Sequence, residues 1–285
     1  MIKEVKEINE VLDFAWNICQ DNTKSSYPKY KTKEDLKSNI ERAINSDIRK
    51  IIACYKNSEL KGVCIYFWIN EDKYSQTEAL LIEDDYDVVA DEFMDYIGDE
   101  LKEYDFFIGV TAYNEKAIQY LENRKMECIE SSIVTLLYKK NYKPHHIKTS
   151  ISLLDFNEFD EYAKFHDKYA GNMYWDSKHI KKDFDIFDIY IYKENGIIKG
   201  SIFVRKIKKQ NQKEVVGLFL DDDVMKRNIE SDLISEMLKD AYKEYSGIDS
   251  VLYFIEEKDE DELKAVIDCG FEIQDRYKCY KCILW

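Results

Sequence analysis

The feature that most constrains the fold of this 285-residue chain is an internal repeat. Residues 51–68 (IIACYKNSELKGVCIYFW) and 188–205 (DIYIYKENGIIKGSIFVR) both read as a strand, a polar turn and a second strand that opens with Lys-Gly. Residues 80–86 (LLIEDDY) then match residues 218–224 (LFLDDDV). Similarity that keeps its order along a chain is typical of duplicated structural units. The sequence therefore predicts two halves that share one fold.

The remaining elements of each half follow in the same order. Each matched stretch after the hairpin leads into an amphipathic helix that ends in Lys-Glu-Tyr, at 102–104 and 243–245. A strand, a short helix and a closing strand come next, at 106–113, 117–123 and 132–138 in the first half and at 250–257, 260–268 and 276–284 in the second. Two helices precede each hairpin, at 8–20, 36–44, 156–169 and 178–184. Mixed strands and helices in this order predict an α/β fold with a mixed sheet in each half.

The boundary between the halves is expected at a polar stretch in the middle of the chain. Residues 141–150 (NYKPHHIKTS) contain Pro144, one of only two prolines. Proline and a run of polar residues are typical of a linker. We therefore expect an N-terminal domain at 1–140, a linker at 141–150 and a C-terminal domain at 151–285.

Composition and charge narrow the classes of function. Hydrophobic residues make up 45% of the chain, enough for packed cores, and no apolar run is long enough to span a membrane. The formal net charge of −15 argues against nucleic acid, which requires a basic surface, and fits a cationic ligand. The charged N-terminus has no signal-peptide core, so we expect a cytoplasmic protein. The cysteines are scattered, and the lone Cys279–Cys282 pair predicts no metal site.

The stretch from Val215 to Tyr245 is the strongest candidate for a ligand site. It reads as a strand at 215–220, a polar loop at 221–228 and an amphipathic helix from Ile229. The free backbone N–H groups and the dipole of a helix N-terminus attract anions, as in the phosphate sites of nucleotide-type cofactors. An ordinary strand-to-helix connection is the alternative interpretation of the same pattern.

The order of elements resembles the GNAT N-acetyltransferase family, duplicated in tandem. The resemblance covers nearly the whole chain, and Cys269-Gly-Phe271 and the stretch Asn114–Glu122 carry it best. It implies that acetyl-CoA lies where the fourth and fifth strands of a half separate. It also implies that the pyrophosphate binds the loop before the central helix.

The second half is the expected cofactor site. The family's loop positions for Gln/Arg, Gly and Gly/Ala fall on Met225, Asn228 and Glu230, none of which matches. Lys226 and Arg227 can compensate through their side chains. The first-half loop, EDDYDV, is about two residues shorter and has no basic residue, so we expect no cofactor there. The cofactor-binding residues that the resemblance implies are Leu218, Phe219, Leu220, Lys226, Arg227, Asn228, Ile229 and Ser231.

The catalytic groups are less well marked. The family's frequent acid, a tyrosine, falls on Leu121 and Val266, which cannot donate a proton. Glu214 and Asp221, at the two ends of the fourth strand of the second half, are candidate bases, and Asp221 is equally a solvated carboxylate. Tyr174 and Trp175 precede a helix that Asp176 is expected to cap, and they are either substrate-binding or packing residues. His166 is expected to face the core.

The implied function is acyl-CoA-dependent transfer of an acetyl group to a primary amine of a small molecule or peptide. The alternative is a non-catalytic tandem GNAT-fold protein that binds a ligand or partner. The expected partners are the amine and a second copy of the chain in a homodimer, with neither nucleic acid nor membrane. The sequence does not identify the amine.

Overall fold

The structure is a computed structural model that describes residues 1–285 except 172, 208–210, 225, 244–246 and 285, and it leaves out the side chains of residues 226 and 227 as well. The chain forms two compact units. Unit 1 comprises residues 1–132 and 275–285, and unit 2 comprises residues 133–274. In the described part of the chain, no helix is both long enough and apolar enough to cross a bilayer.

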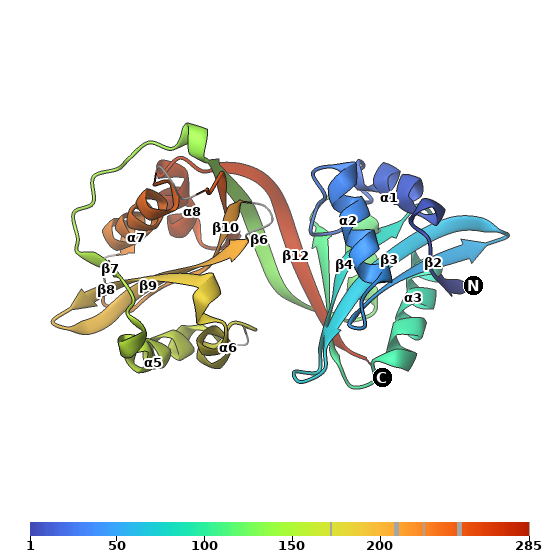
Figure 1. Ribbon diagram of the computed structural model, residues 1–285, viewed down its shortest axis with the longest axis horizontal. Coiled ribbons are helices and arrows are strands. Elements are labelled where there is room, and N and C mark those ends of the chain that lie inside the picture. Colours follow the sequence, from blue (N-terminus) through green and yellow to red (C-terminus); the bar gives the residue numbers. More distant parts are fainter. Residues whose placement is uncertain (172, 208–210, 225, 244–246, 285) are drawn as a thin grey trace. The chain divides into compact units, whose positions relative to one another are not determined.

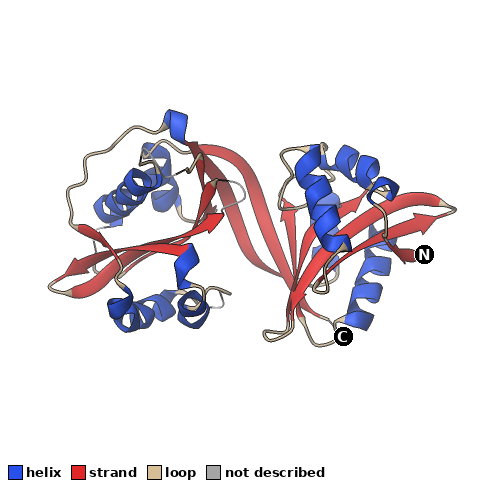
Figure 2. Cartoon of the chain, viewed as in Figure 1, coloured by secondary structure: helices blue, strands red, loops and turns tan. Residues whose placement is uncertain are grey.

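Unit 1 is built around a mixed sheet in the order β1-β2-β3-β4-β5-β12 (Figures 1 and 2). Its strands are β1 (Ile2–Glu4), β2 (Arg49–Lys56), β3 (Glu59–Ile69), β4 (Tyr74–Ile82), β5 (Asp105–Thr111) and the last part of β12 (Glu272–Ile283). Its helices are η1 (Ile8–Glu10), α1 (Leu12–Cys19), α2 (Lys33–Ile44), α3 (Tyr86–Glu100) and α4 (Glu115–Asn123).

Alternating side chains place two cores on the two faces of the unit 1 sheet. Ile51 and Ala53 of β2 pack with α1 and α2, whereas Ile52 and Cys54 pack with α3 and α4. This follows from the two-residue period of a strand, which turns neighbouring side chains to opposite faces. Unit 1 is therefore a three-layered α/β unit with apolar strands buried on both faces.

Unit 2 repeats this plan with the order β6-β11-β10-β9-β8-β7. Its strands are β6 (Glu127–Tyr138, from Ile133 on), β7 (Ile151–Leu153), β8 (Phe187–Glu194), β9 (Ile197–Ile207), β10 (Gln212–Leu220) and β11 (Ser250–Glu256). Its helices are η2 (Lys139–Asn141), η3 (Phe156–Glu158), α5 (Phe159–Tyr169), α6 (Ser177–Lys182), η4 (Phe184–Ile186), α7 (Lys226–Ala241) and α8 (Glu260–Asp268).

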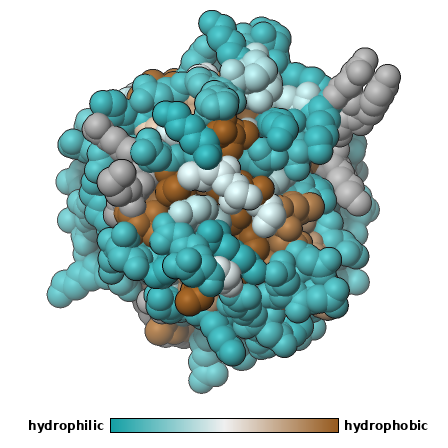
Figure 3. Space-filling model, turned by 90° about the vertical axis from the view of Figure 1, so that its left-hand side faces the viewer, coloured by the Kyte–Doolittle hydropathy of each residue, from teal (hydrophilic) through white to brown (hydrophobic). Residues whose placement is uncertain are grey.

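Figure 1 shows α7 and α8 on one face of the unit 2 strands and α5 and α6 on the other. The two cores again use alternating side chains, since Tyr190 packs with α7 and α8 and its neighbours Ile189 and Ile191 pack with α5 and α6. The outer face drawn in Figure 3 is mostly hydrophilic, with a group of apolar residues near its middle. The sequence-based prediction of an α/β fold with duplicated units is confirmed.

The closing strands belong to different units than the sequence order predicts. β12 comes from the second half, yet Tyr277–Ile283 pair with Thr111–Asp105 of β5 in unit 1, and Tyr280 and Leu284 lie in the unit 1 core. Leu137 of β6 lies in the unit 2 core, and Thr135 donates a hydrogen bond to the carbonyl of Tyr253 (3.1 Å). The expected domain boundaries at 1–140 and 151–285 therefore need correction, because each half supplies the last strand of the other unit.

Local capping agrees with the sequence, and one helix boundary does not. Thr32 and Asp35 form a capping box at α2, and the side chain of Asp176 accepts from His179 N (2.8 Å) at α6, where a cap was expected. The expected loop at 221–228 is shorter than predicted, because α7 already begins at Lys226. The corresponding loop in unit 1, between Ile82 and Tyr86, is shorter still, as predicted.

Candidate functional site

In each unit the fourth and fifth strands pair only where they begin and then separate. β4 and β5 are parallel partners over Tyr74–Gln76, and β10 and β11 over Gln212–Val215. Beyond these residues the inner edge of β4 or β10 faces a gap instead of a neighbouring strand. This separation is the predicted one, and what fills the gap differs between the two units.

In unit 1 the gap is filled by the chain itself. The segment between α1 and α2 enters it, and Ser26 forms an antiparallel bridge with Val110 of β5. Tyr27 N donates to the Gly109 carbonyl (3.0 Å), and Leu80 N of β4 donates to the Ser26 hydroxyl (3.0 Å). The segment thus satisfies backbone groups of both separated strands, as a short strand would.

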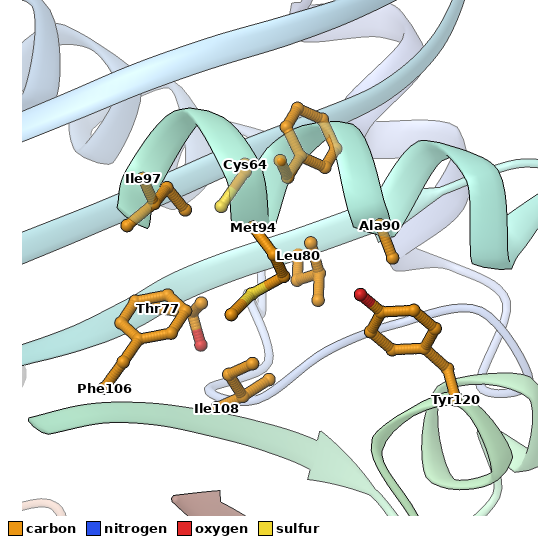
Figure 4. Close-up of a pocket in the computed structure, with 10 residues that line it drawn as sticks. Cys64, Thr77, Leu80, Ala90, Met94, Ile97, Phe106, Ile108 and Tyr120 are labelled. Atoms are coloured by element: carbon orange, nitrogen blue, oxygen red, sulfur yellow. The ribbon is translucent and has the colours of Figure 1, made fainter. Parts of the chain in front are cut away.

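Apolar side chains fill the rest of the gap in unit 1 (Figure 4). Leu80, Phe106, Ile108 and Met94 converge on a residual cavity of about 10 Å³, which is room for about one water molecule. The Tyr120 hydroxyl at its rim donates to Asp91 (2.9 Å). Unit 1 therefore has no space for a cofactor between the described residues of β4 and β5.

In unit 2 the corresponding gap holds a cavity of about 200 Å³. Its lining comes from the end of β10, the start of α7, the start of α8 and the end of α5. The residues are Tyr169, Leu218, Phe219, Leu220, Asp222, Glu230, Asp259 and Glu262. Apolar and aromatic side chains thus meet four carboxylic groups in one concave site, a more acidic lining than that of most small-molecule pockets.

Glu262, in the lining of this cavity, has a strongly shifted pKa. Burial raises the pKa of its carboxyl to about 8, and the negative charges of Asp259, Glu230 and Glu256 act in the same direction. The neighbouring Tyr253 hydroxyl opposes the rise. A carboxyl with this pKa is mostly protonated and neutral at pH 7, so it can donate a hydrogen bond or a proton.

The repeat identifies a backbone donor that faces the unit 2 cavity. Leu80 pairs with Cys64 in unit 1 as Leu218 pairs with Ile202 in unit 2. The pairing register between the third and fourth strands also shifts at the same position of the repeat in both units. The shift lies between Ile65 and Tyr66 of β3 in unit 1 and between Val215 and Gly217 of β10 in unit 2. Successive N–H groups of a strand alternate between its two edges. Because Leu80 N–H points into the gap of unit 1, we infer that Leu218 N–H points into that of unit 2.

Glu214, a predicted base, lies outside the cavity lining. It sits where β10 is still paired with β11, opposite Leu252, and forms an ion pair with Arg205. The guanidinium of Arg205 also lies over the Trp175 ring (5.7 Å to its centroid). This arrangement holds Glu214 as an ion-paired carboxylate next to the loop before α6.

Asp221, the other predicted base, is held by three donors. Lys168 Nζ (3.0 Å), Lys199 Nζ (3.0 Å) and the Tyr169 hydroxyl contact its carboxylate. The hydrogen bond from Tyr169, followed by those from the two lysines, keeps the pKa of Asp221 well below its usual range. A carboxylate this stabilised is a weak proton acceptor near neutral pH, because the donors favour its charged form.

The Trp175 ring packs against the start of β8, and the Tyr174 ring packs against α6. The Trp175 ring lies 5.0 Å from that of Phe187, and the Tyr174 ring lies 4.5 Å from that of His179. His166 is buried, as predicted, and its Nε2 donates to the Trp175 carbonyl (2.8 Å) while Nδ1 accepts from Tyr162 (2.9 Å). Burial lowers the pKa of His166, which favours this neutral form. The histidine therefore fixes the backbone of the Tyr174–Trp175 loop.

The predicted cofactor residues are only partly gathered at the cavity. Leu218, Phe219 and Leu220 line it, whereas Ile229 packs in the core against Gly200 and Asn228 is exposed in the first turn of α7. Ser231 is half-buried, and its carbonyl faces the Cys269 thiol. The side chains of Lys226 and Arg227 lie outside the described residues.

Sequence reasoning did not select Glu262 or Asp259 for the site. The signal for Glu262 was its spacing from Val266, the position on which the family's tyrosine falls. Glu262 precedes Val266 by four residues and therefore lies on the same face of α8. Asp259 accepts from Glu262 N (3.0 Å) as the N-cap of this helix. Val266 itself is fully buried in the core.

Comparison with solved structures identifies the fold. A tandem GNAT protein from the clavulanic acid biosynthesis pathway, solved without acetyl-CoA, matches with a TM-score of 0.61 at 10% identity, over 100% of this chain and 99% of that one. The chain has a tandem GNAT fold. A GCN5-related N-acetyltransferase from Sphaerobacter thermophilus (TM-score 0.64, 10% identity, 100% and 95% coverage) supports this tandem GNAT fold. So does a GNAT-family acetyltransferase from Colwellia psychrerythraea (0.53, 12%, 99% and 99%).

No family model and no curated protein matches this chain by sequence. The match to the solved structures establishes the fold, but identities of 10–12% do not establish the reaction. The activity of the chain must therefore be argued from its own residues.

Proposed function

We propose that this chain is an acyl-CoA-dependent N-acetyltransferase whose single site lies in unit 2. It would move an acetyl group from acetyl-CoA to a primary amine of a small molecule or peptide. Several solved structures with the same fold are acetyltransferases by name, which makes acetyl transfer the first reaction to consider. The assignment to unit 2 comes from this chain alone.

The observation that carries the proposal is the contrast between the two gaps. In unit 1, the Ser26 hydroxyl accepts from Leu80 N, and the segment around it pairs with β5. In unit 2, the equivalent residue Leu218 lines a cavity of about 200 Å³. An open strand edge beside a cavity can bind an extended ligand through backbone hydrogen bonds, as an added strand would be bound.

The described residues fit one part of acetyl-CoA. The thioester and its amide-bearing arm suit the cavity, because Leu218–Leu220 supply backbone groups and apolar contact, and because Glu262 is neutral at pH 7. The phosphates must rely on the start of α7. Its N-terminal N–H groups attract anions, and Lys226 and Arg227 lie in its first turn. Asp222, which lines the cavity before α7, opposes them.

Bound acetyl-CoA would supply an activated acyl group, and the chain would orient it. Leu218 N–H is the donor placed to hydrogen-bond the acyl oxygen, where negative charge develops during attack by an amine. Tyr169 and Phe219, whose rings lie 5.8 Å apart and nearly parallel, give the cavity an aromatic wall. Asp222 and Asp259 add negative charge that attracts an ammonium group.

A second candidate function follows from the same carboxylic groups. Asp222, Glu230 and Asp259 beside two aromatic rings suit a cationic amine that is bound without reaction, and the net charge of −15 adds a long-range attraction for such a ligand. In this alternative, the chain is a non-catalytic tandem GNAT-fold protein that binds an amine.

One experiment separates the two functions. The full chain is incubated with acetyl-CoA and a panel of polyamines, aminoglycosides and lysine-containing peptides, and release of free thiol is followed. In parallel, calorimetry measures binding of acetyl-CoA and of each amine alone. The enzyme proposal predicts acetyl-CoA binding and thiol release with at least one amine. Amine binding without acetyl-CoA binding would contradict it and support the second candidate.

A further inference from the structure

Glu262 lies at the edge of the unit 2 cavity. It lies in the first turn of α8, and its side chain lines the same cavity as Leu218. Its backbone is held by Asp259, which caps the helix through Glu262 N (3.0 Å). One turn further along, Ala265 and Val266 are packed in the core. The capped, anchored first turn of α8 therefore presents the Glu262 carboxyl to the cavity.

The groups that face Glu262 come from three elements. Glu230 approaches from α7 and is only 4% exposed, and Tyr253 approaches from β11 and is 1% exposed. Asp259 and Glu256 flank the start of α8. Among the described residues, the groups that act most strongly on the Glu262 carboxyl are thus three carboxylates and one phenol. Such surroundings favour the neutral acid at position 262, since a second buried negative charge is costly.

We propose that Glu262 is the general acid that protonates the leaving thiolate during acyl transfer in unit 2. The inference rests on the proposed function. As the amine nitrogen bonds to the acyl carbon, the carbon–sulfur bond breaks and its electron pair stays on sulfur. The Glu262 O–H gives its proton to that sulfur, which forms the thiol. The nitrogen loses one proton to the resulting carboxylate, so the amide forms and Glu262 returns to its acid form.

The Tyr169 hydroxyl of the lining donates to Asp221, which leaves Glu262 as the better-placed proton donor. Val266 has no proton to give, and Asp221 is held ionised by Tyr169 and two lysines. The raised pKa of Glu262, about 8, supports its assignment as the acid, because an acid with a pKa near the working pH transfers a proton most effectively.

The test compares the full-length wild type with Glu262→Gln and Glu260→Gln. Gln keeps the shape of Glu262 and removes its acid, whereas Glu260 is exposed on the same helix turn, so that Glu260→Gln is a control with the same substitution. Carboxyl ¹³C NMR of the unliganded proteins follows the titration of Glu262 directly, without any turnover. We expect one carboxyl signal to titrate near pH 8 in wild type and Glu260→Gln, and to be missing in Glu262→Gln.

Kinetics complete the test. Loss of a general acid should lower kcat about 10²–10⁴-fold in Glu262→Gln and remove the fall in kcat above pH 8, while acetyl-CoA affinity changes less than about threefold. If wild type acetylates amines and Glu262→Gln does so equally well, the acid role is wrong and the proposed function stands. If wild type neither binds acetyl-CoA nor releases thiol, both are wrong. A Glu262 signal that titrates near pH 4 also overturns the acid role.

Discussion

Ser26 and Leu80 are joined by a hydrogen bond, in which the buried Leu80 N–H donates to the Ser26 hydroxyl at 3.0 Å. This bond covers the edge of β4. In unit 2, the equivalent edge of β10 is open to a cavity. The first unit thus uses a segment of its own chain where the second offers space for a ligand. A duplicated fold that keeps one open gap can reserve the other copy for stability.

Ser26→Ala should destabilise the protein by about 1–3 kcal/mol, because Leu80 N–H would remain buried without an acceptor. Ser25 gives a matched control. Its hydroxyl is also buried but makes no hydrogen bond within the described residues, so Ser25→Ala should change stability by less than about 0.5 kcal/mol. Urea unfolding of both variants measures the difference. Equal effects at the two serines would show that the Ser26–Leu80 bond does not hold the segment in place.

Asp221→Asn should lower stability at pH 7, and the loss should become smaller as the pH falls below about 4 but should still be present at pH 3. Because the folded-state pKa of Asp221 lies below its unfolded value, its ionised form stabilises the fold above about pH 4, and this contribution fades as the pH falls toward the folded-state pKa. Thermal unfolding of wild type and variant between pH 3 and pH 7 follows the gap. Asp222→Asn controls for the charge change alone. A gap that is equally large at pH 3 would contradict the ionic role of Asp221.

Replacing both Lys226 and Arg227 with alanine should weaken acetyl-CoA binding by one to two orders of magnitude or more. Each charge-assisted contact to phosphate contributes roughly 1.5–3 kcal/mol, and ~1.4 kcal/mol corresponds to a tenfold change. Calorimetry at fixed salt measures the affinity.

The variant Glu230→Gly should bind acetyl-CoA more tightly than wild type, because it removes a negative charge from the first turns of α7. Glu230→Gln separates charge from backbone effects, since glycine also weakens a helix.

A fragment of residues 1–140 should fail to fold alone, since it lacks β12. It would leave the β5 edge uncovered and lose Tyr280 and Leu284 from the unit 1 core. A chain that joins residues 1–132 to residues 275–285 through a flexible linker should fold, because it contains the whole of unit 1. Circular dichroism and amide NMR dispersion of both chains test this. A cooperatively folded 1–140 fragment would contradict the exchange of closing strands.

Much of the fold could be predicted from the sequence because local patterns determine it. The repeated stretches marked the strands, Asp176 marked a helix start, and α8 lies at the predicted residues 260–268. The exchange of β6 and β12 could not be predicted in this way. The two closing strands have the same place in the repeat, and only long-range packing decides which sheet each one completes.

The candidate site was predictable only in part. Leu218–Leu220 follow from the repeat and the family resemblance, but the filling of the unit 1 gap depends on how the segment at Ser26 folds back across Leu80 and Val110. The protonation of Glu262 depends on Glu230, Tyr253 and Asp259, which come together only in the folded chain. Asp221 was a reasonable base by position, yet Lys168 and Lys199 fix its charge.

The central claim is that unit 2, and not unit 1, binds the acyl donor. Hydrogen exchange with and without acetyl-CoA tests it directly, because exchange reports on each backbone N–H segment by segment. We predict that acetyl-CoA slows exchange in peptides that cover residues 216–231 and leaves those that cover residues 78–90 unchanged. Slower exchange at 78–90 alone, or no change at either segment at saturating acetyl-CoA, would contradict the account.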